Sequence, residues 1–294
     1  MTPQELLLVT FCTIDDELKA LPPTPLRARG PRPALADSEV ITIEVVAELL
    51  GRHDDAAIYR HFRRYHAAEF PALARVHRTT FARQAANLCW LKRRLQRRLA
   101  ERLRRPGAPW LIDSTPLPVC RFARAGFCRR FRGQAAYGHD PVARKPFYGF
   151  RLHLRTSPEG VVLGYELAPA DAHELDLVWE LAPDPPGVAV GDRNSGSPAT
   201  REEFRAAGGD LLAPFKHASR DPDPARSEAL LRLRKRIETT IGQLVESLTC
   251  RRVKVKDLWH LENRLVRKIL GHTAAVWLNV QLGQEPLRLA RLAA

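Results

Sequence analysis

In the stretch WLIDSTPLPVC, residues 110–120, an apolar segment typical of a buried strand is followed directly by an acidic residue. Its first three residues are apolar, Asp113 follows directly, and the polar, proline-containing chain after it is typical of a loop. We therefore predict a core strand that ends at Asp113. The segment GVAVGD, residues 187–192, has the same form and ends on Asp192. If these two strands are neighbours in one sheet, their carboxylates converge at its edge.

Two converging carboxylates repel each other, which raises the pKa of one of them unless a cation lies between them. Ligand sets made only of oxygen atoms favour Mg²⁺ or Mn²⁺. A third carboxylate is available on the helix predicted over about 226–248, where Glu238 lies at the edge of an apolar stripe. Arg234 precedes Glu238 by one turn, at the distance that orients it. An ordinary exposed Arg–Glu pair is the alternative interpretation.

The chain around these acids alternates between strands and helices. Besides the two aspartate-ended strands, strands are predicted over 147–157, 160–170 and 210–215, with the turn SPEG between the first two. Helices are predicted over about 172–182, near ATREEFRAAG and over about 226–248. This order predicts an α/β fold with a mixed sheet flanked by helices. The basic segment 120–145 between the strands is predicted to be a loop.

In the first third of the chain the apolar residues recur at helical spacing, and this region is predicted to be all-helical. Its helices are expected over 37–51, 54–70 and 78–105. Short helices joined by tight turns favour a helix-turn-helix-like arrangement. Because RRPGAP interrupts the pattern at 104–109, we expect a helical region over 1–105, an α/β domain over 109–285 and a C-terminal tail over 286–294.

The chain is strongly basic, with 47 Lys and Arg against 33 Asp and Glu, a net charge of +14. Such an excess favours binding to DNA or another polyanion. A genome rich in arginine codons would explain the many arginines, but not the shortage of acids that would balance them. The predicted DNA contacts are the basic residues Arg78, Arg83, Lys92, Arg93, Arg94, Arg97, Arg129, Arg130, Arg132, Lys145, Arg193, Lys216, Arg251, Arg252, Lys254 and Lys256.

Location and thiol chemistry are predicted from what the sequence does not contain. There is no apolar run of about 18 residues, and the acidic N-terminus is unlike a signal peptide, so we expect a cytoplasmic, nucleoid-associated protein with no membrane partner. The five scattered cysteines are expected to be reduced thiols. A zinc site formed by Cys120, Cys128 and His139 is the alternative, although this spacing fits no usual ligand pattern.

Five segments, in order, resemble the DDE-type transposases of bacterial insertion sequences, specifically insertion-sequence family 982. They are ALADSEVITIEVVAELLG, LIDSTPLPVC, FYGFRLHL, GVAVGD and RIETTIGQL. The resemblance implies an RNase H-like catalytic domain over 109–285, preceded by a DNA-binding region. Its three catalytic, metal-binding acids fall on Asp113, Asp192 and Glu238. The ions implied are two Mg²⁺, with Mn²⁺ as a substitute.

Other positions of the family pattern are only partly kept. The arginine of its Tyr-Arg-Glu-Lys signature falls on Arg234, but Leu231 and Val245 stand at the tyrosine and lysine positions. Arg193 replaces a lysine after the second aspartate. His173 is kept, followed by Glu174 where relatives often carry Asp. His173 is expected either to support the site or contact DNA, or to be a structural neighbour of a helix cap.

The function that this resemblance implies is DNA transposition. The expected steps are metal-dependent hydrolysis at the ends of the element, followed by attack of the freed 3′-hydroxyl on target DNA. The expected partner is double-stranded DNA, both element ends and target, with a homodimer holding two ends in a synaptic complex. A nuclease of similar fold without strand transfer, and a non-catalytic, domesticated DNA-binding protein, are the alternatives.

Overall fold

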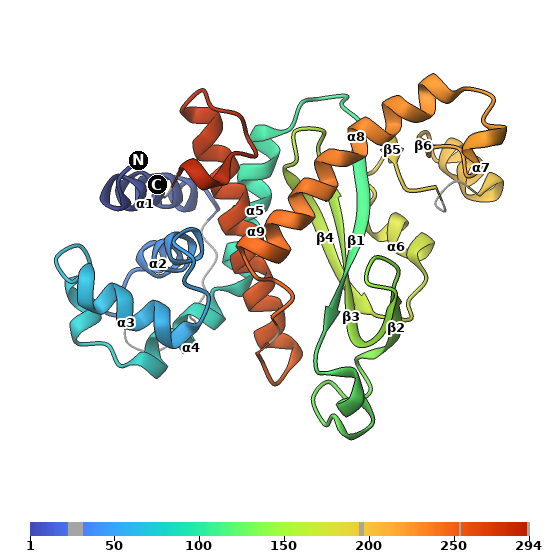
Figure 1. Ribbon diagram of the computed structural model, residues 1–294. Helices are drawn as coiled ribbons and strands as arrows, with labels where there is room; N and C mark the ends of the chain where they lie inside the picture. The colour runs from blue at the N-terminus through green and yellow to red at the C-terminus, as the bar shows by residue number, and fades with distance from the viewer. Residues whose placement is uncertain (23–31, 194–196, 253, 293–294) are drawn as a thin grey trace. The chain divides into compact units, whose positions relative to one another are not determined.

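The computed structural model describes residues 1–22, 32–193, 197–252 and 254–292. By their contacts the residues form two units (Figure 1). The helical unit comprises Met1–Arg102, Glu246–Cys250 and Leu258–Ala294, and the α/β unit comprises Leu103–Val245 and Arg251–Asp257. The division differs from the sequence ranges that we expected, because the last long helix makes its contacts with the N-terminal helices.

The helical unit is built around α2, in which ten of the eleven residues from Ser38 to Glu48 are buried, all except Glu39. Its helices are α1 (Pro3–Lys19), α2 (Asp37–Leu49), α3 (Asp55–Tyr65), α4 (Arg78–Asn87), α5 (Cys89–Leu103) and α9 (Leu258–Gln281), with the short turns η1 (Pro71–Ala74) and η5 (Leu289–Arg291). The continuous helix predicted over 78–105 was wrong: the backbone leaves helical geometry at Leu88, so two helices form. A helix-turn-helix-like arrangement stays a prediction.

A network of buried charges joins α2 and α9 inside this unit. The Arg267 guanidinium, 1% exposed, donates to Glu48 at 2.7 Å and to Asp55 at 2.7 Å. Lys268 donates to the same Glu48 at 2.9 Å, and His53 also contacts it. Because a desolvated charge is costly unless it is paired, this network is stable only when every partner is present.

Replacing Glu48 with Gln should destabilise the helical unit. The substitution keeps the size of the side chain but leaves the buried charges of Arg267 and Lys268 undercompensated, which costs about 3–5 kcal/mol of unfolding free energy. Urea unfolding at neutral pH measures this loss. Glu228→Gln is the control, because its ion pair with Arg232 is fully exposed and its loss should leave stability unchanged. Equal stability of the two variants would contradict the network's role.

The same residue gives the helical unit a defined acid sensitivity. Burial alone would raise the pKa of Glu48, but Arg267, His53 and Lys268 bring it down to about 2, below the ordinary value of 4.5. A depressed carboxylate pKa stabilises the folded state above pH 4.5, and this contribution is lost as the pH falls towards 2. The stability difference between wild type and Glu48→Gln should therefore shrink on acidification below pH 4.5, measured by urea unfolding. A constant difference would refute it.

The α/β unit contains one mixed sheet, as predicted. Its strands are β1 (Trp110–Pro118), β2 (Ala136–Asp140), β3 (Lys145–Thr156), β4 (Val162–Pro169), β5 (Val188–Val190) and β6 (Asp210–Leu212). β3 pairs antiparallel with β1 on one edge and with β2 and β4 in succession on the other. β5 lies between β1 and β6 and is parallel to both. The sheet thus combines an antiparallel half with a parallel half.

Helices cover both faces of this sheet. They are α6 (Glu174–Leu181), α7 (Pro198–Ala206) and α8 (Pro224–Gly242), followed by a π-helical turn, η4 (Gln243–Ser247). Trp110 points to the face of α6 and α7, where its ring lies 6.3 Å from that of Phe204. α8 (orange) crosses β1 on the opposite face, as Figure 1 shows, and Thr240 on it donates to the carbonyl of Gly160 at 2.9 Å.

Two sequence expectations about this sheet need correction. β1 does not end at Asp113 but continues to Pro118, paired with β3 throughout, so Asp113 lies within the strand. The segment predicted to be a loop over 120–145 contains β2 and a 3₁₀ turn, η2 (Phe122–Phe127). The SPEG hairpin is confirmed, since Gly160 donates to the carbonyl of Ser157. None of the helices in the described ranges is long and apolar enough to cross a membrane.

Candidate functional site

The register of β1 and β5 brings the two aspartates to matching positions. Leu111 pairs with Val190 in the parallel ladder, and each aspartate follows its strand's paired residue by two positions. Residues two apart along a strand point to the same face, and neighbouring strands lie about 4.8 Å apart. Gly191 still donates to the carbonyl of Leu212 on β6, which holds the chain in the sheet up to Asp192. Asp113 and Asp192 are therefore presented side by side.

The helix α8 brings the other two expected residues to this face. Arg234, whose side chain is 11% exposed, donates from Nη2 to Oδ2 of Asp113 at 3.3 Å. We expected Arg234 to orient Glu238, but its ion pair is with Asp113, because the turn of α8 that carries it faces β1. Glu238 lies one turn further along and is exposed.

The carboxylate of Asp113 is half-buried, and its surroundings disfavour the ionised form. Burial raises the pKa of its carboxyl group, and the negative charges of Asp192 and Glu238 raise it further. The N–H of Ser114, which donates to Oδ1 at 2.8 Å, and the charge of Arg234 lower the pKa only in part, so it stays above the ordinary value. The charges of Asp192 and Glu238 therefore both act on Asp113, and a cation bound beside Asp113 would relieve this repulsion.

The model of the family described as "Transposase DDE domain" matches residues 109–273, more than half of the chain. The chain belongs to this family. No curated protein and no solved structure matched it. Membership makes the chain a DDE transposase in general terms: DNA is the substrate, and divalent metal ions are what such enzymes use to cleave it.

The carboxylates of Asp113, Asp192 and Glu238 fit a divalent ion by chemistry, while their side chains do not surround one. Carboxylate oxygens are the hard ligands that Mg²⁺ and Mn²⁺ take. As placed, no three His, Cys, Asp or Glu side chains in the described part of the chain lie close enough together to hold an ion. That finding also removes the alternative zinc set of Cys120, Cys128 and His139.

The predicted DNA contact Lys92 is wrong. Its side chain is 0% exposed and pairs with Glu44 at 2.7 Å and with the Asn263 amide oxygen at 2.6 Å. Burial lowers the pKa of its amino group, and Glu44 opposes that effect. Lys92 therefore lies on the inner face of α5 and stabilises the helical unit instead of meeting DNA.

The other predicted DNA contacts of this transposase lie at the surface to different degrees. Arg93, Arg94 and Arg251 are half-buried, and Arg93 lies 3.9 Å from Glu262. The exposed ones are Arg78, Arg83, Arg97, Arg129, Arg130, Arg132, Lys145, Arg193, Lys216, Arg252, Lys254 and Lys256. His173 is exposed and is the N-cap residue of α6, without a side-chain capping bond.

The hydrogen bonds that fix the side chain of Arg251 were not predicted from the sequence. The Arg251 guanidinium donates to the buried Thr115 hydroxyl from Nη2 at 2.8 Å and from Nε at 3.2 Å. Thr115 lies two residues after Asp113 on β1 and so points to the same face of the sheet. Arg251 is thereby fixed beside the acids, although 138 positions separate it from Asp113. The spacing Asp-x-Thr on the strand was the available signal.

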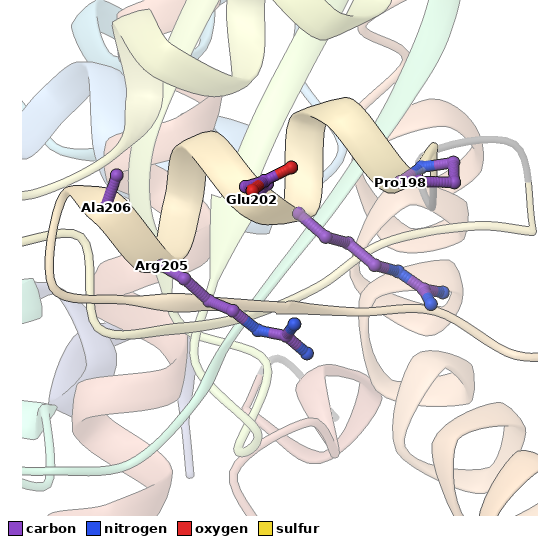
Figure 2. Close-up of a pocket in the computed structure, with 5 residues that line it drawn as sticks. Pro198, Glu202, Arg205 and Ala206 are labelled. Carbon is purple, nitrogen blue, oxygen red and sulfur yellow. The ribbon is translucent and has the colours of Figure 1, made fainter.

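A separate hollow lies along α7 and is lined by Pro198, Arg201, Glu202, Arg205 and Ala206. Figure 2 shows the side chain of Arg205 reaching away from this helix, with Glu202 on the preceding turn. None of the three acids lines the hollow, and its walls come from one helix only. It is an open, charged helix surface and carries no site.

Replacing Asp113 with Asn should stabilise the protein in metal-free buffer at pH 7. The raised pKa means that the ionised carboxylate costs folding free energy at pH values above it, and Asn removes that charge. The amide oxygen can still accept from the Ser114 N–H, whereas the amide nitrogen takes the place of Oδ2 and cannot accept from Arg234. The raised pKa already includes the favourable effect of Arg234, so removing the charge remains a net gain. Thermal unfolding in EDTA measures the effect, with the exposed Asp171→Asn as control. A melting temperature below that of wild type would contradict the electrostatic description of this site.

Proposed function

We propose that Asp113, Asp192 and Glu238 are the catalytic acids of an insertion-sequence transposase. The observation that carries the proposal is the matching register of the two aspartates beyond the Leu111–Val190 pair, with the charges of Asp192 and Glu238 both acting on Asp113. The strand order β4-β3-β1-β5-β6, antiparallel then parallel, supports an RNase H-like fold. The motif pattern supports insertion-sequence family 982 within the wider family.

The three carboxylates are proposed to bind metal ions, whereas Arg234 and Arg251 are proposed to position Asp113 and the DNA. The three carboxylates would hold two divalent ions, Mg²⁺ with Mn²⁺ as a substitute. When bound, such ions lower the pKa of an attacking water or 3′-hydroxyl and neutralise charge on the phosphate. Arg234 fixes Asp113 through its 3.3 Å ion pair, so that this carboxylate keeps one orientation on β1. Arg251, held on Thr115, offers a cation to the phosphate backbone next to the acids.

The reaction proposed is in-line attack on a phosphodiester, first by water at the ends of the element and then by the freed 3′-hydroxyl on target DNA. Positioning and charge neutralisation carry such a phosphoryl transfer. The net charge of +14 supplies the long-range attraction for both DNA partners. Two ends must be held together for joining, so we propose a homodimer, in the cytoplasm at the nucleoid.

Substitution of any one acid should abolish metal-dependent strand cleavage while DNA binding persists. Asp113→Asn, Asp192→Asn and Glu238→Gln each remove a charged ligand. Bound metal ions lower the activation free energy by several kcal/mol, and each 1.36 kcal/mol changes the rate about tenfold. The cleavage rate should therefore fall on the order of a thousandfold. Cleavage of supercoiled plasmid in Mg²⁺ or Mn²⁺ and gel-shift binding measure the two properties. Glu228→Gln is the matched control on the same helix. Cleavage by a variant at the wild-type rate would remove that residue from the site.

Strand transfer is tested by the products. Pre-cut element ends incubated with a plasmid target should yield covalently joined DNA in a metal-dependent reaction. Cut ends without joined products would identify a nuclease of this fold, and DNA binding without any cleavage would identify a non-catalytic relative.

A further inference from the structure

The segment from Cys120 to His139 combines exposed rings with an unbalanced positive charge. Phe127 is 89% exposed, Tyr137 55% and Phe122 47%, unusual for large apolar side chains. The segment contains five arginines, all of them exposed, and no carboxylate: Arg121, Arg124, Arg129, Arg130 and Arg132. Catalysis by the acids uses none of these residues, so this surface needs an explanation of its own.

Two of these rings, Phe122 of η2 and Tyr137 of β2, are held in a fixed arrangement. Phe122 meets Tyr137 edge-to-face, with ring centroids 6.1 Å apart, and Tyr137 packs on Tyr148 of β3 at 5.0 Å. Tyr148 is buried and pairs with Tyr137 in the β2–β3 ladder. Arg121, which is exposed, directly precedes Phe122 in the chain, so an arginine lies close to the ring pair. Phe122, Tyr137 and Tyr148 therefore form a row of packed rings where β2 pairs with β3, and exposed arginines lie nearby in the chain.

The pairing registers place Tyr137 and Tyr148 on the face of the sheet that carries Asp113. Directly paired residues share a face, so Asp113 shares one with Leu154 on β3, and Tyr137 shares one with Tyr148. Leu154 and Tyr148 are six positions apart on the same strand and so point the same way. At about 3.4 Å per residue the rings begin roughly 20 Å from Asp113 along the sheet. Along one strand of a duplex the phosphates repeat at about 3.4 Å, so about six base pairs between the cut phosphate and the rings span this distance.

We propose that Phe122, Phe127 and Tyr137 form a stacking surface for unpaired DNA bases, about six nucleotides from the phosphate that is cut. Nucleobases stack on aromatic rings without regard to sequence, and arginines beside the rings bind the accompanying phosphates. In duplex DNA the ring faces of the bases are covered by their neighbours, so the surface selects DNA that is melted or single-stranded near the element end. The distance in nucleotides rests on the proposed function of Asp113, whereas the stacking itself does not.

The charge on this surface favours nucleic acid over a second copy of the chain. An isologous contact would bring the same five arginines against each other, and like charges facing across an interface are costly. Phosphates neutralise the same arginines and release counterions. The two partners predict different measurements, binding to DNA in one case and self-association in the other.

The test compares binding of a 20-nucleotide oligo-dT and of a 20-base-pair duplex to the full-length chain by fluorescence anisotropy, without divalent ions. Phe127→Ala and Tyr137→Ala should each weaken oligo-dT binding roughly tenfold, the scale of one lost base–ring stack, and change duplex binding less than about twofold. Phe127→Trp should bind oligo-dT as well as wild type. Val142→Ala, an 89% exposed aliphatic residue of the same region, is the matched control and should leave both affinities unchanged.

Two outcomes would overturn the proposal: unchanged oligo-dT binding by both alanine variants, or equal losses for oligo-dT and duplex. A change in self-association on sedimentation, with DNA binding unchanged, would instead identify a protein interface. Because Phe127 is almost fully exposed, its substitution should not disturb folding, which circular dichroism checks. Since the assay contains no metal, its result is independent of whether the three acids prove catalytic.

Discussion

The α/β unit depends on the different lengths over which β1 pairs with its two neighbours, β3 and β5. β3 holds β1 from Leu111 to Pro118, whereas the described ladder with β5 covers only Trp110 and Leu111. Beyond Leu111, backbone hydrogen bonds to β3 therefore fix β1 on one edge. On the other edge β5 ends at Val190, and the chain continues to Asp192. A rigid strand holding Asp113 next to that opening supplies a preorganised carboxylate that ligands can still reach.

Buried charge serves opposite purposes in the two units. In the helical unit Glu48 is surrounded by Arg267, Lys268 and His53, its pKa is about 2, and the charge stabilises the fold. In the α/β unit Asp113 has a raised pKa because burial and two neighbouring carboxylates outweigh Arg234. A charge kept where it is unfavourable is typical of a functional site, since the missing stabilisation comes from the ligand.

The sequence predicted the local features of this protein better than its long-range ones. The apolar runs before Asp113 and Asp192 were sufficient to predict the paired strands, because each pattern is local. The end of β1 was missed because Pro116 and Pro118 suggest a loop, yet a proline is tolerated where a strand does not need its N–H. Lys92 was taken for a surface cation because its partners, Glu44 and Asn263, are 48 and 171 positions away. The partner of Arg234 was missed for the same reason.

We propose that the three carboxylates on β1, after β5 and on α8 together hold the divalent ions. Fe²⁺ substituted for Mg²⁺, with ascorbate and peroxide, generates hydroxyl radicals at the metal and cuts the polypeptide beside it. We expect cuts next to Asp113, Asp192 and Glu238 together, all suppressed by excess Mg²⁺ and absent in Asp113→Asn. Cuts that omit one of the three segments, or that persist in Asp113→Asn, would contradict the claim.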